Sequence, residues 1–197
     1  MNKQAKANRL LFNTGNNEWY TPEPLIEAAR RTMGGIDTDP ASSDKANEVV
    51  KAGQYYTKET DGLNKQWSGN TWLNPPYQVG LIDRFANAVT EKFVSGEIAQ
   101  AIVLTNNATE TKWFQKLLSA ASAVCTPHKR VRFVRPDGTK GQSPLQGQTI
   151  FYFGPNIESF KENFGKFGVI TTILQNRTLE IFTFDEMLIK EKINYKF

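Results

Sequence analysis

The chain has 197 residues, of which 39% are hydrophobic and 22% charged, values typical of one globular domain with its own core. Its single cysteine, Cys125, excludes an internal disulfide bond, and with only one histidine, His128, the chain cannot assemble a zinc site of cysteine and histidine ligands. We therefore expect no metal. Because small apolar residues precede Cys125, we expect a buried structural thiol and assign it no role. The formal net charge of +4 is compatible with a polyanionic partner.

The first segment, residues 1–17, is polar and shows no periodicity, so it predicts a flexible amino-terminal arm. Its only apolar cluster, at 10–12, is too short for a signal-peptide core or a membrane span. We expect a protein that stays in the cytoplasm and has no membrane partner.

The first element along the chain is a helix. Thr21 is its expected N-cap, Pro22 suits the first helical position, and apolar residues follow at helical spacing until Gly34. A short strand is expected at 36–39, followed by a polar loop at 41–47.

Further elements alternate between strand and helix. Strands are expected at 70–73, 101–104, 131–134, 149–153 and 169–174, and helices at 81–93, 110–120 and 157–164. This alternation predicts an α/β fold with a mostly parallel sheet and flanking helices. The expected domain covers residues 18–175, and the segment at 176–197 receives no role.

Two polar segments follow directly on expected strands. They are Asp39-Pro40-Ala41-Ser42 and Asn74-Pro75-Pro76-Tyr77. In open sheets of this class, ligands bind beyond the carboxyl ends of the strands. Both segments could therefore line a single crevice.

The second of these segments suits the activation of an aromatic amine such as that of adenine. The Asn74 side-chain oxygen and the Pro75 carbonyl would accept the two amine protons and aim the nitrogen lone pair at a methyl group. The prolines, Pro75 and Pro76, would stiffen the loop. A base inside a duplex must be rotated out, and Tyr77 offers a ring against which it could stack. The alternative interpretation of these four residues is an ordinary proline turn after a strand.

A basic segment contains Lys129, Arg130 and Arg132. In a strand, Arg130 and Arg132 would lie on one face, where both could contact the phosphates of DNA. Lys129 would reach a phosphate only from the other face or from a preceding turn. The alternative is a solvated edge strand without a partner.

Four segments together resemble a known family. Asn74 to Tyr77 matches the signature of amino-methyltransferases, in which Asp, Asn or Ser precedes two prolines and an aromatic residue. The phage N6-adenine methyltransferases of the Dam type are similar to this chain in three further segments in the same order, Glu18-Trp19-Tyr20-Thr21-Pro22, Asp39-Pro40-Ala41-Ser42 and Asp61-Gly62-Leu63. The resemblance extends from about residue 17 to 153.

The resemblance implies a Rossmann-like methyltransferase fold, S-adenosylmethionine as cofactor, double-stranded DNA as substrate and the cytoplasm of a bacterial host as location. It also implies the residues that border the cofactor, which are Trp19, Thr21, Pro22, Asp39, Pro40, Ala41 and Asp61. For Asp61, a hydrogen bond to the cofactor and a plain turn before Gly62 are equally suited to the sequence. The loop after Asp39 departs from many methyltransferases because it lacks a glycine-rich run.

Two other functions fit parts of the sequence. One is an amino-methyltransferase that acts on RNA or on glutamine side chains of proteins, because the same four-residue signature occurs there. The other is a non-enzymatic module that grips phosphates with Arg130 and Arg132 and stacks a base on Tyr77. For DNA, sequence specificity would come from short loops such as 136–148.

Overall fold

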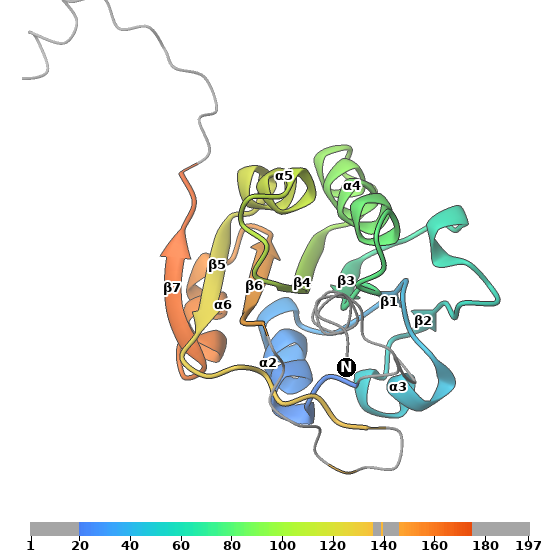
Figure 1. Cartoon of the computed structure of the whole chain (residues 1–197), viewed down its shortest axis with the longest axis horizontal. Coiled ribbons are helices and arrows are strands. Elements are labelled where there is room, and N and C mark those ends of the chain that lie inside the picture. Colours follow the sequence, from blue (N-terminus) through green and yellow to red (C-terminus); the bar gives the residue numbers. More distant parts are fainter. Residues whose placement is uncertain (1–19, 136–138, 140–145, 175–197) are drawn as a thin grey trace, which may run out of the picture.

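A seven-stranded sheet, ordered β2-β1-β3-β4-β6-β5-β7, forms the centre of the computed structural model (Figure 1). The structure describes residues 20–135, 139 and 146–174. The predicted arm at 1–17, the predicted segment at 176–197, Trp19 and most of the loop at 136–148 lie outside the described residues. The strands are β1 (Thr38–Asp39), β2 (Gln54–Tyr55), β3 (Asn70–Leu73), β4 (Gln100–Asn106), β5 (Ala123–Pro127), β6 (Gln148–Phe153) and β7 (Gly168–Thr172).

The sheet is mixed, with most strands in one direction. Strands β1 to β4 are parallel to one another. Strand β6 is antiparallel to β4 and to β5, and β7 is antiparallel to β5. It follows that β5 shares the direction of β1 to β4, and that only β6 and β7 run the other way within the described sheet. The predicted α/β class, with a mostly parallel sheet and flanking helices, is confirmed.

Helices cover both faces of the sheet. They are α2 (Glu23–Met33), α3 (Asp44–Val50), α4 (Leu81–Val94), α5 (Lys112–Ala120) and α6 (Ile157–Phe164). Alternate residues of β4 face opposite sides: Ala101 and Val103 pack with α4 and α5, whereas Ile102 and Leu104 pack with α2 and α6. Figure 1 shows α4 and α5 side by side above the sheet. The central strands of the sheet are therefore buried between two helical layers.

Most of the predicted elements are confirmed. The strand at 70–73 and the helix at 157–164 have the predicted bounds, and the elements expected at 81–93, 101–104, 110–120, 149–153 and 169–174 are present with small shifts at their ends. The first helix begins one residue later than expected, with Pro22 rather than Thr21 as N-cap. The strand expected at 36–39 is limited to Thr38–Asp39.

Three predictions from the sequence were wrong or incomplete. The loop expected at 41–47 contains most of α3, in which Ser43 accepts a hydrogen bond from the Ala46 N–H and so caps the helix. Strands β2 and β5 were not expected. The strand expected at 131–134 is absent, and only Val134 forms an isolated bridge with Tyr20.

The order of the strands creates a switch point between β1 and β3. The chain leaves β1 through α3 to reach β2 on one side, and it leaves β3 through α4 to reach β4 on the other. In open α/β sheets, a ligand crevice forms at such a point, outside the carboxyl ends of the two strands. The residues that follow β1 and β3 are Pro40 and Asn74, so the sheet brings both predicted motifs to this edge.

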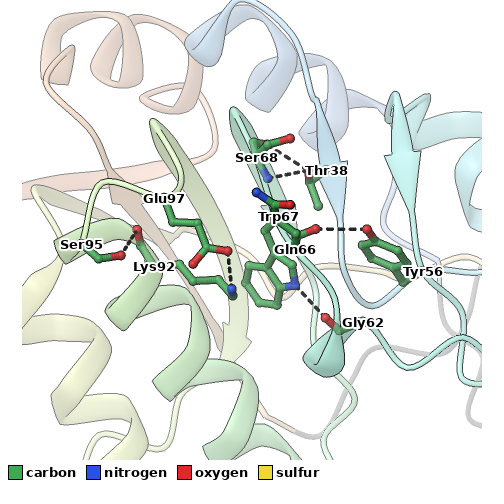
Figure 2. A network of polar contacts seen from close by, with 9 residues as sticks. All are labelled: Thr38, Tyr56, Gly62, Gln66, Trp67, Ser68, Lys92, Ser95 and Glu97. Atoms are coloured by element: carbon green, nitrogen blue, oxygen red, sulfur yellow. Dashed lines mark hydrogen bonds and ion pairs between the residues drawn. The ribbon is translucent and has the colours of Figure 1, made fainter.

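A network of polar contacts around the buried Trp67 ring fixes the segment between β2 and β3 (Figure 2). The Trp67 indole donates a hydrogen bond to the Gly62 carbonyl (2.7 Å), and Lys92 lies 5.5 Å from the centre of the Trp67 ring. The Tyr56 hydroxyl donates to the Gln66 carbonyl (3.0 Å). These contacts hold Gly62 against the turn that follows β1.

We expect Gly62→Ala to destabilise the protein, because the added Cβ would lie 2.9 Å from the Pro40 carbonyl carbon and closer still to its oxygen. Overpacking of this kind costs about 1 to 3 kcal/mol. The measurement is urea unfolding of the variant beside Gly53→Ala, whose added Cβ would meet its nearest neighbour, the Asp37 carbonyl oxygen, at an ordinary 3.5 Å. Equal stability of the two variants would contradict the expected clash.

Candidate active site

The loop after β3 carries the predicted catalytic residues. Asn74 is half-buried and Pro75 is buried, whereas Pro76 and Tyr77 are exposed. The Tyr77 hydroxyl donates a hydrogen bond to Asn74 Oδ1 (3.0 Å) and lies 3.3 Å from the Leu104 carbonyl oxygen. Burial raises the pKa of this hydroxyl, although 39% of the Tyr77 surface is exposed. The hydroxyl end therefore points into the protein while part of the ring faces solvent.

The other end of the Asn74 amide contacts the start of α2. Its Nδ2 group donates to Thr21 Oγ1 over 3.4 Å, and Thr21 is buried. The sequence interpretation placed Thr21 and Pro22 with the cofactor. The structure brings Thr21 to the proposed catalytic amide, a contact between residues 53 positions apart that has no local sequence signal.

Asp39, at the end of β1, is an acidic side chain with only 2% of its surface exposed. Its Oδ1 accepts a hydrogen bond from the Ala41 N–H (3.2 Å). Burial raises the pKa of Asp39 to about 7, against smaller opposite effects of the Ser42 side chain and the Ala41 N–H. Within the described chain, the buried Ser42 hydroxyl has no hydrogen-bond partner of good geometry. The end of β1 thus holds polar groups that the fold itself leaves incompletely satisfied.

The Asp61 carboxylate forms hydrogen bonds with neighbouring groups of the protein itself. It accepts hydrogen bonds from the Leu63 N–H (3.2 Å) and from Asn64 Nδ2 (2.6 Å), and it caps the short 3-10 helix η1 (Gly62–Asn64). The structure therefore shows the turn role of Asp61. Its hydrogen bond to the cofactor stays a prediction. Gly62, the next residue, packs closely against the Pro40 carbonyl and links this turn to the motif after β1.

The basic segment follows β5 and runs past α2 (Figure 1). Lys129, Arg130 and Arg132 are exposed, whereas Val131 and the next alternate residue, Phe133, are buried. The predicted alternation is therefore present without the predicted strand. The physical reason is that the Val131 N–H donates to the Gln148 side chain (2.7 Å) and not to a neighbouring strand.

Two backbone hydrogen bonds join this segment to Tyr20, the first residue that the structure describes. The Tyr20 N–H donates to the Val134 carbonyl (2.9 Å), and the Val134 N–H donates to the Tyr20 carbonyl (2.8 Å). Because Tyr20 precedes Thr21, the basic segment ends beside the residue that contacts Asn74. Sequence reasoning missed both Gln148 and this bridge.

Cys125 lies outside the site, in strand β5. Burial raises the pKa of the Cys125 thiol to about 12, and its Sγ lies 3.8 Å from the Phe164 carbonyl, as suits an unreactive structural cysteine. In the part of the chain that the structure describes, no three His, Cys, Asp or Glu side chains gather in a way that could hold a metal ion. No helix among these residues has the length and apolar character needed to cross a membrane.

Comparison with known proteins supports the resemblance seen in the sequence. The chain finds no match among curated proteins. The model of the family DNA N-6-adenine-methyltransferase (Dam) matches residues 11–179, which include β1, β3 and both of the motifs that follow them. With most of its length matched, and with the two motifs side by side at the switch point of an α/β sheet, the chain belongs to the Dam family of DNA N-6-adenine-methyltransferases.

Proposed function

We propose that the chain transfers a methyl group from S-adenosylmethionine to the N6 amino group of an adenine that is flipped out of double-stranded DNA. The observation that carries this proposal is the position of Asn74 at the carboxyl end of β3, beside the buried carboxylate at the end of β1, in a member of the Dam family.

The residues at the end of β1 fit the cofactor. S-adenosylmethionine carries an ammonium group, and a cation beside Asp39 would stabilise the ionised carboxylate that burial otherwise disfavours. The buried Ser42 hydroxyl, which lies close enough to Asp39 to lower the pKa of that carboxyl, offers a further polar contact. Thr21, Pro22, Pro40 and Ala41 would border the same pocket, with Asp61 near it and Trp19 beyond the described residues. When bound, the cofactor supplies an electrophilic methyl group on its sulfonium sulfur.

The loop after β3 would activate the adenine amine. The lone pair of this nitrogen is delocalised into the ring, so acceptors must draw the nitrogen toward tetrahedral geometry. Asn74 Oδ1 and the Pro75 carbonyl are the proposed acceptors of its two protons. Pro76 stiffens the loop, and the exposed part of the Tyr77 ring would stack on the flipped base.

The exposed basic segment would hold the DNA backbone. Arg130 and Arg132 extend from one side of a segment whose buried side chains anchor it to the fold, and Lys129 lies one residue before. The two backbone bonds between Val134 and Tyr20 place the end of this segment next to Thr21. Phosphates bound here would therefore lie near Thr21, the residue that contacts Asn74.

The direct test is transfer of labelled methyl groups from S-adenosylmethionine to DNA, to RNA and to protein, followed by identification of the modified base. Formation of N6-methyladenine in DNA is the expected result. Transfer to RNA or to glutamine side chains instead would show that DNA is not the substrate. Absence of cofactor binding in calorimetry would favour a non-enzymatic module.

We expect Asn74→Ala to lower the rate of methyl transfer by about 100-fold or more while the dissociation constant for S-adenosylmethionine stays nearly unchanged. The reason is that the lost acceptor acts chiefly on the amine as it is activated. Single-turnover assays and calorimetry measure the two effects. Asn163→Ala, in α6, is the matched control and should keep full activity. A rate for Asn74→Ala near that of the control would remove Asn74 from the mechanism.

We expect Asp39→Asn to stabilise the protein at pH 8. The folded-state pKa of about 7 exceeds the ordinary value of 3.8, so the folded protein retains a proton that the unfolded chain has already lost. Stability of the wild type therefore falls as pH rises from 3.8 to about 7, by roughly 4 kcal/mol at most. Urea unfolding should show a gain at pH 8 that vanishes near pH 4, and Asp83→Asn should show no such gain.

The same substitution should weaken binding of S-adenosylmethionine at pH 8, since a neutral amide cannot pair with an ammonium group. In the wild type, affinity should rise with pH until Asp39 is ionised, above about pH 7. Titration calorimetry at pH 6 and pH 8 measures both effects. An Asp39→Asn variant with wild-type affinity at pH 8 would move the cofactor away from the end of β1.

We expect Arg130→Gln and Arg132→Gln each to weaken DNA binding. Each lost phosphate contact lowers the slope of log affinity against log salt concentration by about one. Arg31→Gln, exposed at the far end of α2, is the matched control. If both variants keep the wild-type DNA affinity and salt dependence, the segment is solvated and does not contact DNA. A loss of affinity for one DNA sequence alone would identify an arginine that reads a base.

A further inference from the structure

The basic segment is held at its middle by a buried side chain. Gln148, the first residue of β6, has only 2% of its surface exposed. Its Oε1 accepts a hydrogen bond from the Val131 N–H (2.7 Å), and its Nε2 donates one to the Gln146 carbonyl (2.7 Å). A buried glutamine amide therefore joins the backbone of the basic segment to the start of β6.

The two partners leave this amide a single orientation. A backbone N–H group can only donate a hydrogen bond, and a backbone carbonyl can only accept one. Rotation of the Gln148 amide by 180° would turn its NH2 group toward the Val131 N–H and its oxygen toward the Gln146 carbonyl, so both hydrogen bonds would be lost. Because buried polar groups without partners are costly, the observed arrangement is the stable one.

Gln148 ties the basic segment to the edge of the sheet that carries the candidate site. It pairs with Asn106, the last residue of β4. Strand β4 is parallel to β3 and continues past its end, because Leu73, the last residue of β3, pairs with Val103. The glutamine side chain therefore contacts the basic segment at the same edge of the sheet at which Asn74 follows β3.

This contact lies between the two arginines that are proposed to bind phosphates. Arg130 and Arg132 are exposed and directly flank Val131. The other backbone attachments of the segment are at its ends, through hydrogen bonds of His128 and Val134. The glutamine amide is therefore nearer in the chain to both arginines than either of these end attachments is.

We propose that Gln148 is a positioning residue for DNA binding, whose amide holds Val131 so that Arg130 and Arg132 are in place for the phosphates. This inference rests on the proposed function, and it adds a buried residue that acts through the arginines. Without the amide, DNA would have to order the segment as it binds, and this ordering lowers affinity.

The first experiment compares Gln148→Met with Tyr152→Phe. Methionine has nearly the length of glutamine and removes both hydrogen bonds of the amide. Tyr152 is buried on the same face of β6, toward the other end of the strand. Its hydroxyl also forms two hydrogen bonds, with Gln100 Oε1 (2.6 Å) and with the Asn156 N–H (3.1 Å). Tyr152→Phe therefore controls for a general loss of stability.

We expect Gln148→Met to raise the dissociation constant for a DNA duplex about 5- to 10-fold, the effect of about one neutral hydrogen bond, with unchanged affinity for S-adenosylmethionine. The KM for DNA should rise by a similar factor, while kcat at saturating DNA stays near the wild-type value. Tyr152→Phe should leave both constants unchanged. Wild-type DNA binding by Gln148→Met, or an equal loss in Tyr152→Phe, would overturn the proposal.

The second experiment repeats Gln148→Met in a chain that also carries Arg130→Gln and Arg132→Gln. If the amide acts through the arginines, its removal should lower DNA affinity less than about 2-fold in this background. An equal loss in both backgrounds would show that Gln148 acts elsewhere and would contradict the proposal. Wild-type DNA affinity in the arginine variants themselves would instead remove the phosphate contact from the proposed function, and this inference with it.

The third measurement needs neither DNA nor cofactor. Hydrogen exchange of the Val131 amide, followed by NMR, reports directly whether the Gln148 side chain holds the segment. We expect this amide to exchange at least about 10-fold faster in Gln148→Met than in the wild type, and at the wild-type rate in Tyr152→Phe. An unchanged exchange rate in Gln148→Met would show that the segment is held without the amide, and the proposal would be wrong.

Discussion

The parallel pairing of β1 with β3 is the constraint on which the site depends. Thr38 pairs with Thr71, and both residues are fully buried, so neither strand can shift without exposing the core. The connections from the two strands leave in opposite directions, and in open α/β sheets a ligand crevice forms at such a point. Asp39 and Asn74 come to the same edge for this reason, although they lie far apart in the sequence.

Helix α2 and the residues just before it add contacts to this edge. One end of the helix contacts Asn74 through Thr21, and its other end contacts Asn70 through the Met33 carbonyl. The bridge between Tyr20 and Val134 then adds the basic segment on the outside of the same helix. A single short stretch, residues 20–22, therefore touches the proposed catalytic amide, the expected cofactor border and the proposed DNA-binding segment.

Local sequence patterns were sufficient to predict the helices and strands that bury continuous apolar faces. β3, α4, β4 and α6 have clear periodicity, and the four-residue motif after β3 could be placed at a strand end from sequence alone. Helix α3 could not be predicted from the sequence, because only Val50 of its residues is buried and its polar sequence is typical of a loop. The segment at 131–134 has the alternation of a strand, but its backbone bonds go to a side chain and to Tyr20. Such distant partners leave no trace in a local pattern.

Burial of Asp39 lowers the stability of the protein near neutral pH and at the same time offers a place for a cation. A carboxyl group at the end of a buried strand loses hydration, and one N–H group within hydrogen-bond distance does not replace the water it has lost. A cationic ligand beside the group would offset the desolvation that raises its pKa. In the proposed function, the feature that weakens the free protein near neutral pH is therefore the one that would favour a positively charged cofactor at the end of β1.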